Sequence, residues 1–200
     1  PKACHRLIID LAPTNAFLDA QAISYPDFGI FIWRSETFFL SVRCGQIGQS
    51  GNGGHAHNDQ LSFELQINGE DWTADPGSFT YTANPKKRDA YRSHLAHSGP
   101  RFDLSEPSRL NLGMFRLEDN AQARCLLFDE NEFLGTHNGY KLPVYRHLKL
   151  GSETLEITDC LGGWDPSLKE ITETKIDNAQ DLRKHLGLSV PYSRGYGLAD

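Results

Sequence analysis

The sequence predicts an all-β protein: a multi-stranded antiparallel β-sandwich formed by a single domain over residues 1–200. Turn signals recur at the short spacing typical of all-β proteins, and they do not alternate with long amphipathic helices. The clearest strand segments follow one another as hairpin pairs. A length of 200 residues can bury one sizeable core, and no Gly/Ser-rich or Pro-rich linker divides it.

The predicted strands are rich in β-branched and aromatic residues, which favour the pleated conformation. A first hairpin turns through the polar residues Ser35-Glu36-Thr37. A second hairpin turns at Asn68-Gly69, a dipeptide that favours two-residue hairpin loops. In chain order, the predicted strands are 29–34, 38–43, 61–67, 71–74, 113–117, 124–128, 144–150 and 154–159.

Three stretches do not fit a sheet. Residues 85–97 contain Lys86-Lys87-Arg88 and are predicted to form a loop with a short helical turn, and residues 179–185 have a helix-like composition. The last fifteen residues are rich in Gly, Pro and Tyr, so we expect them to be irregular.

Composition excludes several classes of protein. The net charge of −6 argues against a general binder of nucleic acid or anionic membranes, because such proteins need a positive surface. No apolar run approaches the roughly 18 residues of a membrane span. The four cysteines form no CxxC pair, which argues against a zinc ribbon and a dense disulfide framework. Because the chain begins at Pro1 and its one methionine is Met114, we expect a processed chain or a piece of a longer one.

The stretch from residue 51 to residue 67 carries the most information about function. Its odd positions from 61 to 67 are apolar and the even positions between them are polar, a period of two that predicts one buried face. If this strand continues backwards without a bulge, His55, His57 and Asp59 fall on the same inward face. Polar side chains buried there without partners are costly, so they need something to bind.

A metal ion is one such partner. An HxH pair on a strand places two imidazoles about 7 Å apart, so that one can bind a metal while the other faces a substrate. Zinc takes three or four ligands, and Asp75, His94 and His97 are the further candidates nearby. His57, Asp75 and His97 together have the chemistry of a His₂Asp site. The alternative is that each histidine is an ordinary surface or core residue.

The register of the second hairpin bears on Asp75. A two-residue Asn68-Gly69 loop directs Asp75 away from His57, whereas a three-residue loop with a bulge directs it to the inward face. The metal hypothesis therefore predicts the bulged register, or a break at Pro76.

These motifs resemble a known family. The C-terminal β-sandwich of heparinase II/III-like polysaccharide lyases, which are related to some alginate lyases, is similar in sequence to this chain. The similarity is ordered and specific over residues 28–98, and it continues more weakly as far as residue 159. The motifs that carry it are 54–65 (GHAHNDQLSFEL), 75–81 (DPGSFTY), 88–93 (RDAYRS) and Ala96-His97.

The resemblance implies a site and a missing partner. In that family an N-terminal α/α toroid, which these residues lack, packs against the sandwich, and the polysaccharide lies between them. It implies that His57, Asp75 and His97 bind a metal, usually zinc and here expected to be structural, and that His55 faces the substrate cleft. The family commonly has Asn after the third ligand, where this chain has Ser98.

The implied activity is lyase cleavage of an acidic polysaccharide. β-Elimination at a uronic acid removes the C5 proton, stabilises the carboxylate-linked enolate and expels the C4 oxygen. The acid and base lie largely on the toroid, so this chain alone is expected to be inactive, with His55 binding the carboxylate or assisting proton transfer. The substrate is expected to be heparin/heparan-sulfate-like, alginate-like or a bacterial exopolysaccharide. The resemblance slightly favours a periplasmic or secreted protein.

Further substrate contacts are expected between these motifs. Arg88 and Arg92 suit bidentate recognition of carboxylate or sulfate. For Lys86 and Lys87 we favour a solvated basic loop over a substrate contact. Tyr81 and Tyr91 are candidates for sugar stacking or proton transfer, and equally for core aromatics with satisfied hydroxyls.

Two other functions are consistent with the sequence. One is a non-catalytic carbohydrate-binding sandwich with a structural metal. The other is a cupin-like metalloenzyme, since two histidines and a carboxylate on a β-sandwich also bind iron. The family-specific Asp75-Pro76-Gly77 and Ala96-His97 matches argue against the second.

Overall fold

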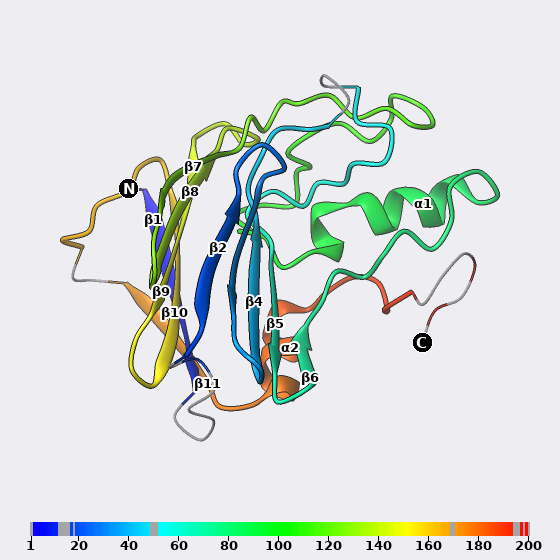
Figure 1. Cartoon of the computed structure of the whole chain (residues 1–200). Helices are drawn as coiled ribbons and strands as arrows, with labels where there is room; N and C mark the ends of the chain where they lie inside the picture. The colour runs from blue at the N-terminus through cyan, green and yellow to red at the C-terminus, as the bar shows by residue number, and fades with distance from the viewer. Residues whose placement is uncertain are drawn as a thin grey trace.

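Two β-sheets packed face to face form the centre of the chain (Figure 1). The computed structural model describes residues 2–11, 17, 19–48, 52–168, 171–193, 197 and 199. One sheet has the order β11-β1-β10-β9-β8-β7 and the other β2-β3-β4-β5-β6. β1 and β11 pair in parallel, while the other neighbouring strands run antiparallel. The predicted all-β sandwich is confirmed.

The elements have the following bounds: β1 (Ala3–Asp10), β2 (Gln21–Tyr25), β3 (Ile30–Arg34), β4 (Phe38–Arg43), β5 (Phe63–Ile67), β6 (Glu70–Thr73), α1 (Pro85–Arg92), the 3₁₀ helix η1 (His94–Ala96), β7 (Arg124–Phe128), β8 (Glu132–His137), β9 (Val144–Leu150), β10 (Thr154–Leu161), β11 (Thr172–Ile176) and α2 (Ala179–Leu186). None of the described helices is long and apolar enough to cross a membrane.

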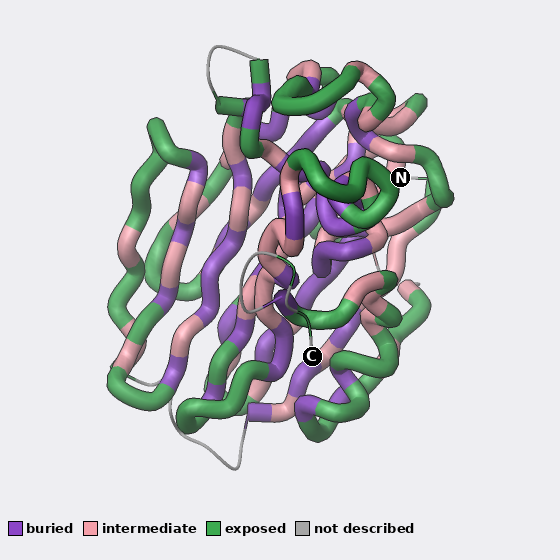
Figure 2. The backbone as a smooth tube through the Cα atoms, turned by 90° about the vertical axis from the view of Figure 1, so that its right-hand side faces the viewer, coloured by how far each residue is buried: buried purple, intermediate pink, exposed green. Residues whose placement is uncertain are grey.

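The core fills the space between the two sheets. Figure 2 shows that the buried positions run through the middle of the strands, while the turns at their ends are exposed. Every second residue of β5 is buried, as its period of two predicts. Each large apolar side chain buried here contributes about 1.5–3 kcal/mol relative to exposure. The largest fully buried side chains include Ile9, Trp33, Leu40, Phe63, Leu65, Phe133, Leu148 and Leu155.

Several predicted strands form with the expected bounds, and one predicted strand is absent. β7 and β9 coincide with their predictions, and β3 and β4 form the expected hairpin. The segment 113–117 is not a strand, because Gly113 (φ 96°) and Phe115 (φ 56°) adopt positive φ, which a pleated strand does not allow. The sequence did not predict β1, β2, β8 or β11.

The stretch that carries the HxH motif also departs from its prediction. β5 begins at Phe63, and Leu61 has a φ of 61°, so the strand does not continue backwards to His55. Residues 54–62 instead form a series of turns, which we call the HxH loop. The expectation that His55, His57 and Asp59 share one strand face is therefore wrong, and any convergence of site residues arises from the loop.

The hairpin of β5 and β6 combines the two registers considered for Asp75. Ile67 pairs with Glu70 across a two-residue turn, so the three-residue loop is not formed. The register then shifts between Gln66 and Leu65, because β6 contains one extra residue at Trp72. The metal hypothesis required a bulge that turns Asp75 to the inward face of the sheet. The structure has such a bulge, but the bulge lies inside β6 and not in the turn.

The two α-helices begin at side-chain caps. Asn84 accepts a hydrogen bond from the Lys87 N–H at 3.1 Å and precedes Pro85, which suits a first helical position. α2 begins after Asn178 and ends at Gly187, whose left-handed conformation terminates the helix. In Figure 1, α1 lies on the side of the five-stranded sheet. Residues 188–193 are irregular, as predicted, and residues 194–196, 198 and 200 of the predicted irregular end lie outside the described residues.

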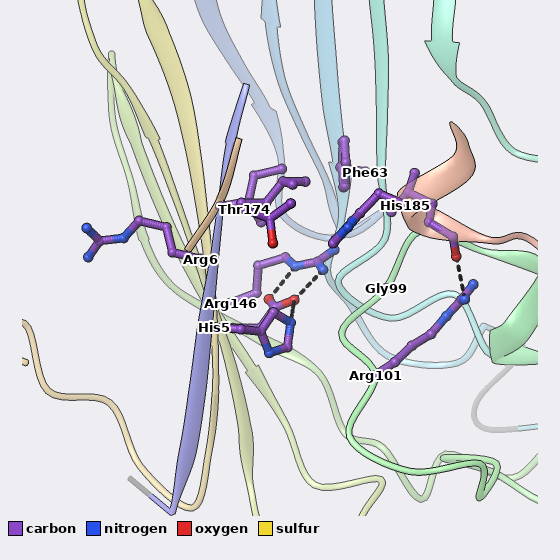
Figure 3. Close-up of a pocket in the computed structure, with 12 residues that line it drawn as sticks. His5, Arg6, Phe63, Gly99, Arg101, Arg146, Thr174 and His185 are labelled. Atoms are coloured by element: carbon purple, nitrogen blue, oxygen red, sulfur yellow. Dashed lines mark hydrogen bonds and ion pairs between the residues drawn. The ribbon is translucent and has the colours of Figure 1, made fainter. Parts of the chain in front are cut away.

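A disulfide and a buried ion pair join the strands of the six-stranded sheet. Cys4 and Cys160 are directly opposite each other on β1 and β10 and are disulfide-bonded. On the neighbouring pair, Arg146 of β9 binds Asp159 of β10 through two hydrogen bonds of 2.7 Å (Figure 3). The same guanidinium donates to the carbonyls of Leu61 and Ser98. Arg146 therefore connects the sheet to two segments that lead into the candidate site.

Candidate metal centre and adjoining pocket

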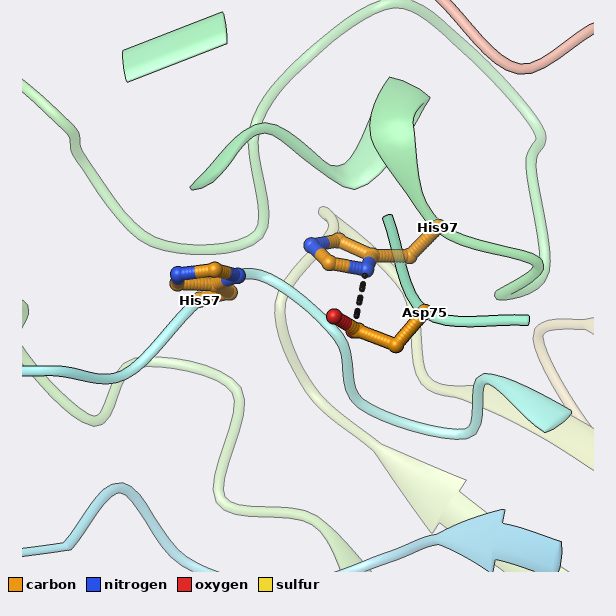
Figure 4. A group of neighbouring side chains, drawn as sticks. All are labelled: His57, Asp75 and His97. Carbon is orange, nitrogen blue, oxygen red and sulfur yellow. Dashed lines mark ion pairs between the residues drawn. The ribbon is translucent and has the colours of Figure 1, made fainter. Parts of the chain in front are cut away.

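The three predicted metal ligands come together although they lie far apart in sequence. The ligating atoms of His57, Asp75 and His97 all lie within 4.8 Å of one another (Figure 4). His57 comes from the HxH loop, Asp75 from the segment after β6, and His97 from the end of η1. We call these three residues the metal cluster.

The donor set fits a cation such as zinc. His97 Nδ1 lies 3.1 Å from Asp75 Oδ2, and its Nε2 is buried with no hydrogen-bond partner among the described residues. A buried nitrogen without a partner is costly, and a metal ion would satisfy it. The Asp75 side chain is 42% exposed, and its carboxylate points toward His97.

The protonation states of the cluster suit metal binding. Burial lowers the pKa of His57 to about 4, and the neighbouring His97 adds to the shift, so His57 is neutral and one ring nitrogen carries a lone pair. Burial would raise the pKa of Asp75 and lower that of His97, but their mutual hydrogen bond outweighs both effects. Asp75 is therefore ionised, and its negative charge favours a cation beside it.

Arg92 of α1 holds the HxH loop in place. Its Nε donates to the carbonyl of Ala56 at 3.1 Å, and its own carbonyl accepts from the Asn58 N–H at 2.9 Å. These two bonds bracket His57 on both sides. Arg92 is buried, which lowers its pKa. Its Nη1 has no hydrogen-bond partner in the part of the chain that the structure describes, and Asp89 Oδ1 lies 3.9 Å from it as an ion-pair partner.

Glu106 joins the two segments that carry the histidine ligands. Its carboxylate accepts from Asn58 Nδ2 at 2.7 Å, from the Ser93 hydroxyl and from the His94 N–H at 3.0 Å. Burial would raise the pKa of Glu106, but the bonds from His94, Ser93 and Asn58 lower it below its usual range. The sequence gives no local signal for this role, because Glu106 lies in an irregular segment. His94, the fourth metal candidate, belongs to this network and not to the metal cluster.

A small pocket lies next to the metal cluster and gathers five of the predicted site residues. It is lined by His55, His57, Tyr81, Arg88 and Arg92, together with Phe115, and we call it the site pocket. The exposed ring of His55 meets Tyr81 edge to face, with 5.2 Å between the ring centroids. The sequence predicts these five residues as site candidates, and the fold places all five around one pocket.

Two of the proposed substrate contacts have partners within the protein. Arg88 is buried and its Nε donates to Asp89 at 2.9 Å. Tyr91 is also buried and stacks on Phe79 at a centroid distance of 5.3 Å. Contact of either residue with substrate stays a prediction.

Comparison with known families identifies the family of this chain. Residues 19–189 match the family described as heparinase II/III-like, C-terminal. The chain belongs to this family. The resemblance inferred from the HxH loop and from the Asp75 and His97 motifs is thus confirmed, and the match covers nearly all of this heparinase II/III-like chain. No curated protein matches it.

Solved structures share the fold of this chain. A heparan sulfate lyase HepC mutant from Pedobacter heparinus superposes with a TM-score of 0.54 and 21% identity, covering 70% of this chain and 22% of that one. A structure of heparinase III gives 0.52 and 15%, covering 64% and 20%. At these identities the similarity shows the fold. The heparinase II/III-like chain therefore spans about a fifth of the length of these structures.

Proposed function

We propose that this chain is the sandwich part of a polysaccharide lyase that cleaves a uronic-acid-containing polysaccharide by β-elimination. One observation carries the proposal: an exposed histidine, His55, and the guanidinium of Arg92, whose Nη1 makes no hydrogen bond among the described residues, belong to one pocket beside a His₂Asp cluster. Histidine and arginine hydrogen-bond donors of this kind suit the carboxylate of a uronic acid. Heparan-type, alginate-type and bacterial exopolysaccharides all present that group.

The residues of this chain would act on the carboxylate. Elimination builds negative charge there as the C5 proton leaves, and hydrogen-bond donors aimed at that charge lower the barrier. His55 donates to the carboxylate or assists proton transfer, and Arg92 Nη1 supplies fixed positive charge in the same pocket. The base at C5 and the acid at O4 come from an N-terminal α/α toroid, so the isolated chain is expected to bind without turnover.

His57, Asp75 and His97 would hold zinc in a structural role. The bound ion would link the HxH loop, the segment after β6 and the end of η1, and it would thereby fix the backbone next to His55. The Cys4–Cys160 disulfide supports a periplasmic or secreted location, because such bonds persist in oxidising compartments.

The activity is tested on the whole encoded protein by following the ultraviolet absorbance of unsaturated uronate. We expect His55→Ala to reduce the rate by roughly 10²-fold or more, the size of a lost general acid–base or charge-stabilising group. The matched control is His185→Ala, a histidine of α2 outside the site pocket. An unchanged rate in His55→Ala refutes the role of His55, and binding without turnover by the whole protein would favour a carbohydrate-binding module.

The metal is tested by elemental analysis of the purified chain. We expect one zinc per chain in the wild type and in His185→Ala, and its loss in His57→Ala. Stoichiometric zinc that survives His57→Ala would refute the assigned ligands.

A further inference from the structure

We propose that Phe115 is an aromatic platform on which one pyranose ring of the bound polysaccharide packs, next to His55. The inference rests on the proposed function and adds a subsite to it: a surface for the apolar C–H face of a sugar, beside the groups that bind the carboxylate. No sequence pattern predicts this subsite, because residues 113–117 resemble a strand.

The backbone at Phe115 is held in a conformation that disfavours its side chain. Its φ of 56° lies in the left-handed region, where a phenylalanine is sterically strained. Such strain persists only where the surroundings impose it, and it gathers at binding and catalytic sites. A loop without a function for Phe115 would be more stable with glycine at this position.

The surroundings that impose this conformation belong to the candidate site itself. The Arg116 carbonyl accepts from Arg92 Nη2 at 2.9 Å, and the Leu117 N–H donates to the Asn52 carbonyl at 2.9 Å. Leu117 is fully buried. Arg92 therefore fixes both the HxH loop and the loop that carries Phe115.

Glycine at position 53 allows the two loops to meet. Gly53 has a φ of 62°, and a Cβ atom there would clash with the Leu117 carbonyl and with Ile47. Only glycine combines this backbone conformation with so close an approach. The position of Phe115 relative to the HxH loop is thus set by Arg92 and by Gly53.

The Phe115 ring is presented to the site pocket. It is 39% exposed, and its centroid lies 5.5 Å from that of His55 and 6.0 Å from that of Tyr81. Arg92, whose Nη1 makes no hydrogen bond among the described residues, lines the same pocket. An aromatic face beside a cation matches a sugar acid, which is apolar on its ring face and charged at its carboxylate, better than it matches an apolar protein segment.

The test measures binding of uronate hexasaccharides, one from heparan sulfate and one from alginate, to the 200-residue chain by calorimetry. Truncating an aromatic anchor typically weakens binding about fivefold or more, so we expect this loss for Phe115→Ala and near-wild-type affinity for Phe115→Tyr. Leu126→Ala, which removes another exposed apolar side chain on β7, is the control and should bind normally. Saturation-transfer NMR should show contact with sugar ring protons in the wild type and its loss in Phe115→Ala.

The outcomes separate this inference from the proposed function. If the wild type binds neither hexasaccharide, both fail. If the wild type binds and Phe115→Ala binds equally well, or if Phe115→Tyr loses as much affinity as Phe115→Ala, the platform alone is refuted. Phe115→Gly distinguishes a strained binding residue from a packing residue: we expect it to bind weakly and to unfold at the wild-type temperature or above, whereas a packing role requires a lower unfolding temperature.

Discussion

Replacing Arg146 by methionine removes a buried cation that serves the six-stranded sheet and the candidate site together. Its guanidinium donates to both carboxylate oxygens of Asp159 at 2.7 Å and to the Leu61 carbonyl at 2.6 Å. Both charged side chains are buried, so water cannot take the place of the lost partner. Removing one member of a buried pair costs about 3–5 kcal/mol, a large share of the roughly 5–15 kcal/mol that stabilises a typical domain.

The acid dependence of stability gives a second measure of the same pair. Burial alone would raise the pKa of Asp159, but Arg146 outweighs burial and lowers it from 3.8 to about 2. This shift stabilises the fold by about 2 kcal/mol above the unfolded-state pKa, and the contribution is lost as the pH falls through the folded-state pKa. Without Arg146, burial raises the pKa of Asp159, and protonation of Asp159 then favours the folded state. The gap in stability between wild type and variant should therefore narrow by at least about 2 kcal/mol on acidification from neutral pH to about 2.

Urea unfolding followed by tryptophan fluorescence at several pH values measures both effects. Arg109→Met is the matched control, because Arg109 forms an ion pair of 2.8 Å with Glu118 but is exposed, and such pairs contribute about 0–1 kcal/mol. A loss of less than about 1 kcal/mol in Arg146→Met at neutral pH, or a gap that stays constant on acidification, would show that this pair does not stabilise the fold as argued.

Three further predictions concern the metal cluster and the disulfide. Chelation of bound zinc should accelerate hydrogen exchange most within residues 54–97, because metal binding adds to the stability of the segments it joins; equal exchange with and without chelator would contradict this. Glu106→Gln should weaken zinc affinity about 10–100-fold in a competition titration, since Glu106 orients both histidine-bearing segments. Glu118→Gln, which changes a half-buried carboxylate paired with Arg109, should leave zinc affinity unchanged. Reduction of Cys4–Cys160, which closes a separation of 156 residues, should cost about 2–5 kcal/mol in urea unfolding, and a Cys4→Ser variant should lose a similar amount and be insensitive to reductant.

The regular part of the fold could be predicted because a strand with one buried face alternates apolar and polar residues. β5 alternates apolar and polar residues, since one of its faces packs in the core, and the Asn68-Gly69 turn sets the hairpin that follows. β2 and β11 gave no such signal: both are edge strands whose residues are mostly exposed, so neither face carries an apolar pattern. A strand without a buried face cannot be recognised from its period.

The residues of the metal cluster could be predicted from the sequence, but the backbone that positions them could not. Residue types and motifs placed His57, Asp75 and His97 in one ligand set, and the structure brings them within 4.8 Å. The strand that was expected to aim His57 inward is interrupted at Leu61, whose positive φ has no signature in a leucine. Glu106 was missed for the same kind of reason, because its role depends on contacts that the sequence does not display.

The segments that carry the site are irregular, and this explains why buried charged residues surround it. The HxH loop and the segment after η1 cannot satisfy their backbone groups through a strand ladder, so each needs side chains as partners. Arg92 binds the loop at Ala56, and Arg146 binds it at Leu61 and binds the other segment at Ser98. These bonds hold the loop on both sides of His57 through protein groups alone. The metal is then expected to tighten a geometry that already exists, so that its loss loosens the site without unfolding the sandwich.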